Sequence, residues 1–528
     1  MLKSLPLGII RAFDLRFLLE APGMVSLGNI RSWARSNKVI LVLLLILLLG
    51  SFLRIYDLGA ESLWLDEAYD INFAKQSLPS IIEALASIEH HPPLHYVVLH
   101  FWMLPFGSSE IATRALSAIF GIISIFLIYQ IGCQLFNRKV GLIGSFLSSI
   151  SYFHIYYSQE VRVNGLLLLL TLLSFFFFIK VLKSDNTRKL YFPLLFLANL
   201  CLAYSHVYGL FVIISQIFYF LLFWNRYKHI RIWFLGVQVA TLAFFSPWIP
   251  SFIGQVSRIA QGFWIPEPSL ITAVGTIATY AGSGWGKVLL LLVFLVVCLM
   301  GLFSITKLSG KWTLRKPLQS LKGLRWRVGF ESVGAILLLL IWFSFPIIIP
   351  FIVSKFFTPI YEVRNTISAS PALYLLAAKG ISTFTNRKAL YAVVILIAAL
   401  SLPGLQYYYT HDVKEQWRET ADFIEYNSQA DDVIIFCAGY VQIPFDYYYE
   451  GDPEKFGIGR NVADAQEIAA TVDNAVAGKQ RLWLILSHEG EALTEDYLID
   501  RFGSDSVIVE KEFVGVKVYL FGLQVESP

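Results

Sequence analysis

Two adjacent acidic residues, Asp66 and Glu67, follow the first long apolar stretch of the chain, within the segment 62–69 (SLWLDEAY). A carboxylate that is partly shielded from water can take a raised pKa and act as a general base toward a hydroxyl group. Ionisable groups at a membrane edge are costly to bury and are therefore typical of functional sites. The alternative interpretation is that the pair caps a helix at the interface. We take Asp66 and Glu67 as the catalytic candidates.

Basic residues elsewhere in the chain are candidates for binding a phosphate group: Arg162, Arg364 and Lys355. Arginine offers a planar fork of donors that suits phosphate, although an arginine at a membrane edge also reaches toward lipid headgroups. Glu160 and Tyr361 lie close to these residues in the sequence and join them as candidates for substrate binding. Together with the acidic pair, the arginines indicate a lipid-linked phosphate and an acceptor hydroxyl that a carboxylate activates.

Histidines add a second set of polar candidates. Glu89, His90 and His91 form a local cluster that could hold a cation, and His206 lies between two apolar segments. His91 and His206 are also candidates for substrate contact. A lone histidine at a membrane interface is more often structural, so the need for a divalent metal ion stays open.

The composition defines the broad class of protein. Of the 528 residues, 56% are hydrophobic and only 15% are charged, whereas soluble domains have about 25% charged residues. The chain is therefore expected to be an α-helical polytopic membrane protein. Its formal net charge of +4 is too small to indicate a nucleic-acid partner.

We predict about eleven membrane-spanning helices from apolar stretches of about 20 residues. The segment Leu270–Ala281 is too short to span and is assigned to an interfacial or re-entrant helix. The long loop 57–110 between the first two spans carries the acidic pair, and residues 81–88 within it are expected to form an amphipathic surface helix. The predicted spans are 38–56, 111–135, 139–157, 163–182, 190–206, 208–224, 231–250, 287–306, 332–353, 366–384 and 388–406.

The distribution of Lys and Arg predicts the orientation of these spans. Basic residues gather in the segment 1–37, in the loop 307–330 and in one set of short loops. The positive-inside rule places all of them in the cytoplasm. Asp66, Arg162 and Arg364 then face the outside of the cell membrane. The N-terminal segment lacks the short apolar core of a cleavable signal peptide and is expected to stay cytoplasmic.

Residues 407–528 differ from the rest by their shorter apolar runs and higher charge. Strand-like runs alternate with segments of helical spacing, which predicts a soluble α/β domain outside the membrane with a largely parallel sheet. We expect this domain to support the site or dock the substrate. The predicted strands are 433–437, 481–487, 506–510 and 516–521, the last two as a pair joined near Gly515, and the predicted helices are 416–426 and 463–477.

Several of these motifs resemble a known family. In chain order, the segments Leu63–Tyr69 (LWLDEAY), His91–Tyr96 (HPPLHY), Tyr156–Arg162 (YYSQEVR) and Tyr361–Arg364 (YEVR) are similar to motifs of the GT-C glycosyltransferases. The nearest branch comprises the bacterial relatives of protein O-mannosyltransferases and of lipid A aminoarabinose transferases. The resemblance covers nearly the whole chain after the N-terminal segment, and it implies a transmembrane catalytic domain at residues 38–406.

The resemblance implies a membrane glycosyltransferase that takes a sugar from a polyprenyl-phosphate carrier at the outer face of the membrane. The acceptor is expected to be a hydroxyl group on a glycan, a lipid or a protein. The first-loop acid is the catalytic centre of such enzymes, which maps to Asp66, with Glu67 adjacent. An arginine of a later external loop contacts the donor phosphate, which maps to Arg364 or Arg162. One base without a second carboxylate nucleophile suits inversion at the anomeric carbon.

The chain departs from the family pattern at two positions. Relatives often carry tyrosine two residues after the arginine that matches Arg162, and directly after the one that matches Arg364. This chain has Asn164 and Asn365 there. The preference for the sugar or for the carrier is therefore expected to differ.

Other functions fit parts of the pattern. A transporter or flippase of lipid-linked saccharides usually holds its ionisable groups near the bilayer midplane, often within repeated halves, whereas these acids lie in an outer loop and no repeat is visible. A polysaccharide polymerase or ligase is expected to carry its catalytic residues in a large, later external loop. If the protein were a non-catalytic scaffold, the location of Asp66, Arg162 and Arg364 on the same side of the membrane would have no explanation.

Overall fold

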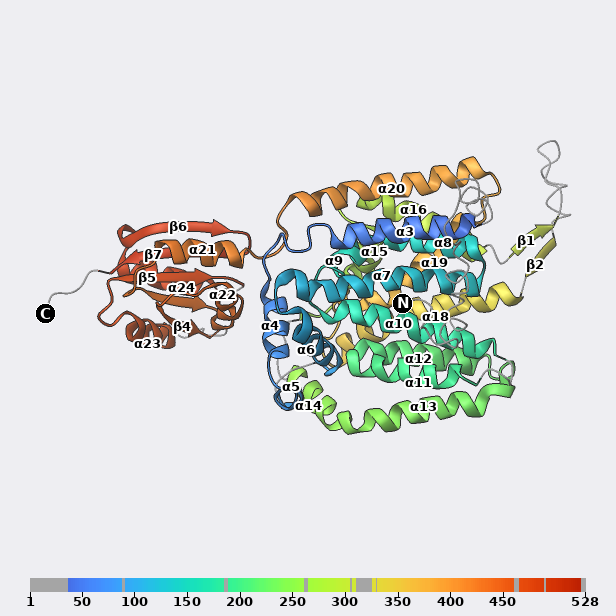
Figure 1. The fold of residues 1–528 in the computed structure, drawn as a ribbon, viewed down its shortest axis with the longest axis horizontal. Helices are drawn as coiled ribbons and strands as arrows, with labels where there is room; N and C mark the ends of the chain where they lie inside the picture. Colours follow the sequence, from blue (N-terminus) through green and yellow to red (C-terminus); the bar gives the residue numbers. More distant parts are fainter. Residues whose placement is uncertain are drawn as a thin grey trace, which may run out of the picture.

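The computed structural model describes residues 37–87, 91–184, 189–260, 265–303, 306–309, 325–328, 330–459, 465–488 and 491–523. A bundle of helices makes up most of the molecule, and a small domain built on a sheet lies off one end of it (Figure 1). The expectations for Glu89 and His90, for all but the last residue of segment 1–37, and for most of the loop 307–330 fall outside the described residues.

Long apolar helices form the bundle. Among the described residues, six helical stretches are long and apolar enough to cross a membrane. Each overlaps one predicted span, because an uninterrupted run of about 20 apolar residues is a strong helix signal. These stretches comprise α3 (Lys38–Ile55), α7 (Glu110–Leu135), α10 (Val163–Leu182), α13 with α14 (Arg231–Phe245 and Ile249–Ala260), α18 (Phe330–Phe356) and α20 (Arg387–Thr410).

The other predicted spans correspond to shorter helices, so the total of about eleven stays a prediction. Two of the breaks have a local cause in the sequence. The Ser151 side chain accepts a hydrogen bond from His154 N and starts α9, and the His206 side chain caps α12 in the same way. These helices are α8 (Arg138–Ser149) with α9 (Tyr152–Tyr156), α11 (Tyr191–Ser205), α12 (Val207–Leu222), α16 (Lys287–Phe303) and α19 (Ser370–Ile381).

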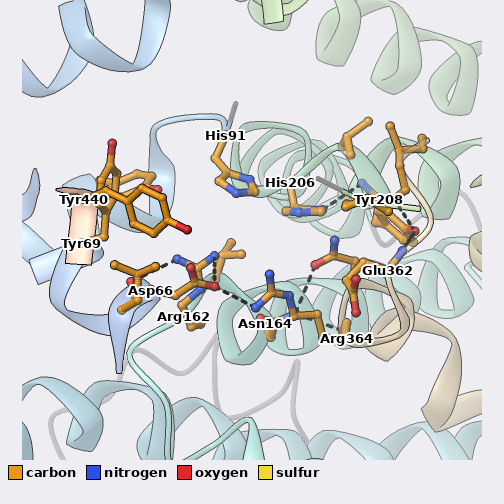
Figure 2. A pocket seen from close by; sticks show the side chains of 17 residues that line it. Asp66, Tyr69, His91, Arg162, Asn164, His206, Tyr208, Glu362, Arg364 and Tyr440 are labelled. Atoms are coloured by element: carbon orange, nitrogen blue, oxygen red, sulfur yellow. Dashed lines mark hydrogen bonds and ion pairs between the residues drawn. The ribbon is translucent and has the colours of Figure 1, made fainter. Parts of the chain in front are cut away.

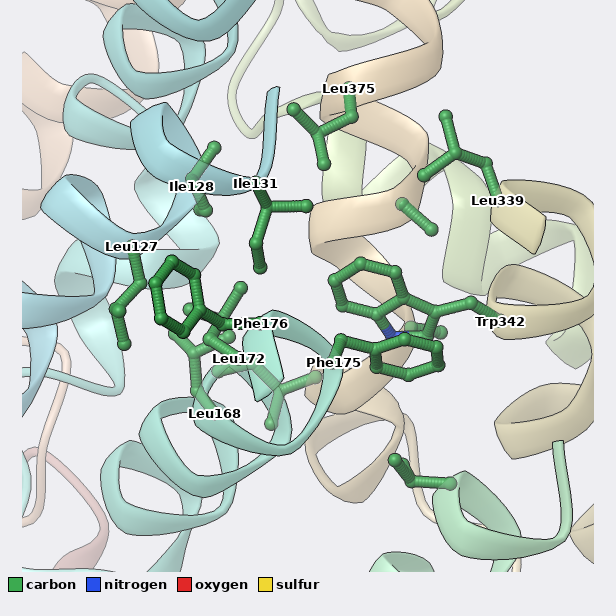
Figure 3. Packing of buried hydrophobic residues seen from close by; sticks show 14 of the residues in the cluster. Leu127, Ile128, Ile131, Leu168, Leu172, Phe175, Phe176, Leu339, Trp342 and Leu375 are labelled. Atoms are coloured by element: carbon green, nitrogen blue, oxygen red, sulfur yellow. The ribbon is translucent and has the colours of Figure 1, made fainter. Parts of the chain in front are cut away.

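The core of the bundle is built around α10, which is apolar and buried on nearly all sides. In Figure 3, Phe175 of this helix stacks on Trp342 of α18, with ring centroids 3.9 Å apart. The Trp342 indole N–H donates to the carbonyl of Ser368 at 2.7 Å. Ser368 belongs to the 3₁₀ helix η5 (Val363–Ala369). The core therefore fixes the segment that carries Arg364.

The described residues of the loop after α3 form three short helices at the end of the bundle that faces the sheet domain (Figure 1). They are α4 (Leu65–Ala74), α5 (Leu78–Ser87) and α6 (Leu94–Phe106). The amphipathic helix expected at 81–88 corresponds to α5, where Ile81 and Leu85 are buried while Ile82 is exposed. The short segment assigned to an interfacial or re-entrant helix forms α15 (Leu270–Ala281).

In the described residues of the C-terminal part, the sheet has five strands in the order β4–β3–β5–β7–β6. The expectation of a largely parallel sheet is wrong for half of the pairings. β3 pairs in parallel with β4 and β5, but β7 is antiparallel to both β5 and β6. The reason is the tight turn at Gly515, with φ of 71°, which joins β6 and β7 as a hairpin. The strands are β3 (Val433–Cys437), β4 (Glu454–Ile458), β5 (Arg481–Leu486), β6 (Val507–Phe513) and β7 (Val516–Gly522).

Helices cover both faces of this sheet. One face packs against α21 (Trp417–Asn427) and α22 (Gln442–Tyr448). The other packs against α23 (Ala465–Val476) and α24 (Glu491–Phe502). Two apolar layers therefore enclose the strands, as in other α/β domains.

Candidate active site

The helix α4 determines where the two catalytic candidates point. Consecutive residues on a helix diverge by about 100°, whereas residues four apart share a face. Asp66 therefore shares a face with Asp70 and diverges from Glu67. The start of this helix is fixed by Glu415, whose carboxylate accepts a hydrogen bond from Leu65 N at 3.2 Å.

Asp66 lies in the wall of a cavity of about 480 Å³ at the end of the bundle beside the sheet domain. Figure 2 shows side chains from α4, from the start of α10, from the α11–α12 junction and from the segment around η5 converging on this space. The cavity brings together five of the residues that the sequence singled out as catalytic or substrate-binding candidates. These are Asp66, His91, Arg162, His206 and Arg364.

Two arginines hold the carboxylate of Asp66. Arg364 Nη1 donates to Asp66 Oδ2 at 2.8 Å, and Arg162 Nη2 lies 3.3 Å from the same oxygen. Burial alone favours the protonated acid, but the charges of Arg162 and Arg364 outweigh it and hold the pKa of Asp66 below its ordinary value. About a quarter of the Asp66 side chain (26%) remains exposed to the cavity. It is thus an accessible, ionised acid.

Arg162 is itself anchored by a second carboxylate. Arg162 Nη1 donates to Asp70 Oδ1 at 2.7 Å, and the other oxygen of Asp70 lies 3.0 Å from His95 Nε2. Both Asp70 and His95 are buried. Neither residue was predicted from the sequence to belong to the site, although the spacing of four between Asp66 and Asp70 on a helix was a usable signal.

Glu67 points away from the cavity into a buried ionic network. Arg114 donates to both of its carboxylate oxygens, at 2.9 and 2.6 Å, and Lys414 Nζ donates at 3.2 Å. The backbone N–H of Val161 adds a further hydrogen bond of 2.9 Å. Burial opposes ionisation, but these partners lower the pKa of Glu67 to about 2. The geometry fits a residue that connects α4 to α7 and to the segment before Arg162.

Glu160 is buried close to this network but does not line the cavity. Neither of its carboxyl oxygens has a hydrogen-bond partner among the described residues. Burial raises the pKa of Glu160 to about 7, with a smaller raising effect from Glu67, while Lys414 acts in the opposite direction. Glu160 was a candidate for substrate binding from the sequence, but the structure places it outside the cavity lining.

Of the four candidates for metal binding, His91 and His206 lie close together in the structure. The rings of His91 and His206 lie on the cavity wall with centroids 5.4 Å apart (Figure 2). His206 Nδ1 accepts a hydrogen bond from Tyr208 N at 3.2 Å. Glu89 and His90, the other two metal candidates, lie outside the described residues. Within the part of the chain that is described, no group of three or more His, Cys, Asp or Glu is placed to hold a metal ion.

Lys355 and Tyr361 lie outside the set of residues that line the cavity. Lys355 Nζ is 3.3 Å from Glu267 in an exposed ion pair. The Tyr361 hydroxyl is 2.7 Å from Thr276 Oγ1 of α15, in buried surroundings. Tyr361 thereby ties α15 to the segment before Arg364.

Further lining residues were not found from the sequence. Glu362 and Tyr208 line the end of the cavity near His206, and Tyr69 lines the end near Asp66 (Figure 2). Tyr440 comes from the C-terminal sheet domain. Asn164 has a positional role, because its side-chain amide donates to the carbonyl of Arg364 at 3.0 Å.

Comparisons with known proteins agree with this fold. Residues 90–250 match a family model described as dolichyl-phosphate-mannose-protein mannosyltransferase. Comparison with curated proteins gives no match. Among solved structures, ArnT from Cupriavidus metallidurans, in its apo state and bound to undecaprenyl phosphate, superposes with a TM-score of 0.58 and 12% identity. The match covers 93% of this chain and 100% of ArnT.

A second similar structure is the apo form of an oligosaccharyltransferase from Archaeoglobus fulgidus, with a TM-score of 0.52 and 10% identity. That match covers 86% of this chain and 70% of the oligosaccharyltransferase. The family match and the shared fold confirm the resemblance to GT-C glycosyltransferases related to protein O-mannosyltransferases and lipid A aminoarabinose transferases.

Proposed function

We propose that the chain is an inverting glycosyltransferase of the GT-C type, which moves a sugar from a polyprenyl-phosphate carrier to a hydroxyl group of a glycan, a lipid or a protein. The observation that carries the proposal is the triad of Asp66, Arg162 and Arg364, which come from distant parts of the chain and meet on one cavity wall. An acid and two cations at this spacing match what the reaction requires.

The arginines have the chemistry to bind the donor. The phosphate of a polyprenyl-phosphate sugar carries the charge that develops as the glycosidic C–O bond breaks, and preorganised cations stabilise that charge. Arg364 and Arg162 reach the same oxygen of Asp66, so a phosphate at this point competes with Asp66 for their donors. ArnT has been solved with undecaprenyl phosphate bound, which supports a carrier of this class.

Asp66 then acts on the acceptor. The acceptor oxygen attacks the anomeric carbon, the bond from that carbon to the phosphate oxygen breaks, and the hydroxyl proton passes to Asp66. The pKa of Asp66 is low while both arginines face it, which makes it a weak base before the donor binds. A donor phosphate that takes up the arginines' positive charge raises the basicity of Asp66 at the moment when the reaction needs it.

The same proposal includes topology and domains. Residues 1–37 form a cytoplasmic segment, residues 38–406 form the catalytic domain in the plasma membrane, and residues 407–528 form an extracytoplasmic domain. The basic loops support this orientation through the positive-inside rule. The charged cavity then opens on the outer side.

Two alternative functions are compatible with the same features. A transporter or flippase of lipid-linked saccharides also needs a charged cavity, and a polymerase or ligase also uses lipid carriers. The position of Asp66 at one end of the bundle, beside the sheet domain, favours an enzyme, because transporters usually bind near the midplane.

The test is to incubate the purified protein with a panel of radiolabelled polyprenyl-phosphate sugars, both hexoses and pentoses, together with candidate acceptors. The proposal expects one donor to be consumed, with release of free polyprenyl phosphate and a product of inverted anomeric configuration. Translocation of intact donors across vesicles without cleavage would instead identify a flippase.

A further inference from the structure

The geometry points to an acceptor subsite that the C-terminal sheet domain completes, in which the ring of an acceptor saccharide stacks on Tyr440 and Tyr69 beside Asp66. This inference rests on the proposed function and deepens it. Of the proposed acceptors (a glycan, a lipid or a protein), the inference favours a sugar hydroxyl. The C-terminal domain would then contact the acceptor directly.

The first support is the place of Tyr440 in the sheet. β3 and β5 are neighbouring parallel strands, so their carboxyl ends lie at the same edge. The chain leaves β3 toward α22 on one face of the sheet, and it leaves β5 toward α24 on the opposite face. In open α/β sheets, ligands bind in the crevice where adjacent strands send their loops to opposite faces. Tyr440 and His488 follow these two strand ends.

The second support is the cavity itself. The Tyr440 ring lines the cavity together with Tyr69 and Asp66. Figure 2 shows both tyrosines at the Asp66 end, while Tyr208 and Glu362 lie at the opposite end. Two tyrosine rings therefore line the end of the cavity where the acceptor hydroxyl has to approach the acid.

His488 reinforces this end of the site. Its ring centroid is 5.9 Å from that of Tyr440, and its Nε2 lies 3.2 Å from Glu415 Oε1. The other oxygen of Glu415 accepts from Leu65 N, the residue before Asp66. One carboxylate therefore connects the strand end of the sheet domain to the start of the catalytic helix.

The third support is that the sheet domain is firmly docked on the loop that carries Asp66. The hydroxyl of Tyr448 accepts a hydrogen bond from Leu63 N at 2.7 Å. Glu61 Oε2 accepts from Lys414 N at 2.7 Å, and Ser62 Oγ donates to the carbonyl of Glu415 at 2.6 Å. Tyr440 is thus held at a defined position relative to Asp66.

The chemistry of this end favours a sugar over the other acceptor classes. A sugar ring has an apolar face of C–H groups that packs on an aromatic ring, and an edge of hydroxyl groups that needs polar partners. Tyr440 and Tyr69 offer two such rings on the cavity wall, and Asp66 lies beside them. A peptide or an acyl chain has no comparable need for two aromatic faces next to an acid.

The test measures acceptor binding separately from the reaction. The probes are methyl α-mannopyranoside, methyl β-glucopyranoside and a serine- and threonine-containing peptide, observed by saturation-transfer difference NMR on the purified full chain. We expect a methyl glycoside to bind, Tyr440→Ala to weaken that binding about tenfold or more, and Tyr440→Phe to retain it. Tyr426→Ala is the matched control, because Tyr426 lies in the same domain and is 90% exposed.

Undecaprenyl phosphate serves as the folding control, since its binding should be unchanged in Tyr440→Ala. If that variant fails to fold, Tyr440→Leu replaces it, because leucine keeps much of the apolar bulk without the aromatic face. Binding of the peptide alone, or equal glycoside binding in wild type and Tyr440→Leu, overturns the inference. The proposed function is tested apart from this: it fails if Asp66→Asn still transfers sugar, whatever Tyr440 does.

Discussion

Arg364 Nη1 lies 2.8 Å from Asp66 Oδ2, although 298 residues separate the two in the chain. The contact joins the proposed catalytic acid to an arginine, a side chain that suits phosphate binding. In the proposed mechanism the donor phosphate and the acid share this cation, so donor binding and the basicity of Asp66 are expected to be coupled.

This coupling predicts a change in pH dependence. In Arg364→Ala, burial still favours the protonated form of Asp66, but one of the charges that lower its pKa is lost. The pKa of Asp66 should therefore rise, and the acid limb of the kcat/KM profile should move to higher pH. Arg364→Lys, which keeps the charge, should move it less. Superimposable acid limbs in wild type and Arg364→Ala would contradict the coupling.

Donor binding should depend on Arg364 and not on Lys355. We expect Arg364→Ala to weaken the binding of undecaprenyl phosphate by about tenfold to a hundredfold, the loss of a charge-assisted contact. Lys355→Ala should leave it unchanged, because Lys355 pairs with Glu267 in an exposed position outside the cavity lining. Binding is measured by isothermal titration calorimetry in detergent. Equal losses in both variants would place the phosphate elsewhere.

Replacement of Glu67 should reduce stability. Glu67→Gln leaves the charges of Arg114 and Lys414 buried without their partner, which costs about 3–5 kcal/mol. Because the folded pKa of about 2 lies below the ordinary value of 4.5, the stabilising contribution is complete above pH 4.5 and is lost as pH falls toward 2. Thermal unfolding of wild type and Glu67→Gln measures the difference. A wild-type melting temperature for the variant would contradict the network's role.

The ionisation of Glu160 should affect the pH dependence of stability with the opposite sign. Its folded pKa of about 7 lies above the ordinary 4.5, so the unfolded chain ionises first and the folded state loses stability as pH rises from 4.5 to 7. The loss amounts to about 3 kcal/mol. We expect Glu160→Gln to be more stable than wild type at pH 8 and equal to it near pH 4.5. Melting temperatures across this range check the sign, and a variant less stable at pH 8 would contradict it.

The sequence was sufficient to bring Asp66, Arg162 and Arg364 together as candidates, but not to separate them from Glu160 and Lys355, which do not line the cavity. The order of apolar segments and basic loops assigned Asp66, Arg162 and Arg364 to one side, and all three line one cavity. The long apolar helices could also be predicted, since α3 and α10 begin and end within a residue of the predicted spans. Hydrophobic runs of this length leave little room for another structure.

The sequence could not predict how the acidic pair divides its roles. Asp66 and Glu67 are adjacent, and only the tertiary partners decide which of them faces the cavity. Those partners are remote: Arg114 is 47 residues from Glu67, and Lys414 is 347 residues from it. The contribution of Tyr440 was hidden for the same reason, because it depends on how the sheet domain docks.

The most direct test of the central claim is sugar transfer by purified Asp66→Asn, with the labelled donor that wild type consumes. Glu83→Gln is the matched control: it makes the same acid-to-amide change on the exposed side of α5 in the same loop. We expect Asp66→Asn to lose at least about a hundredfold in kcat with undecaprenyl phosphate binding intact, and Glu83→Gln to match wild type. Turnover near the wild-type rate by folded Asp66→Asn would contradict the account.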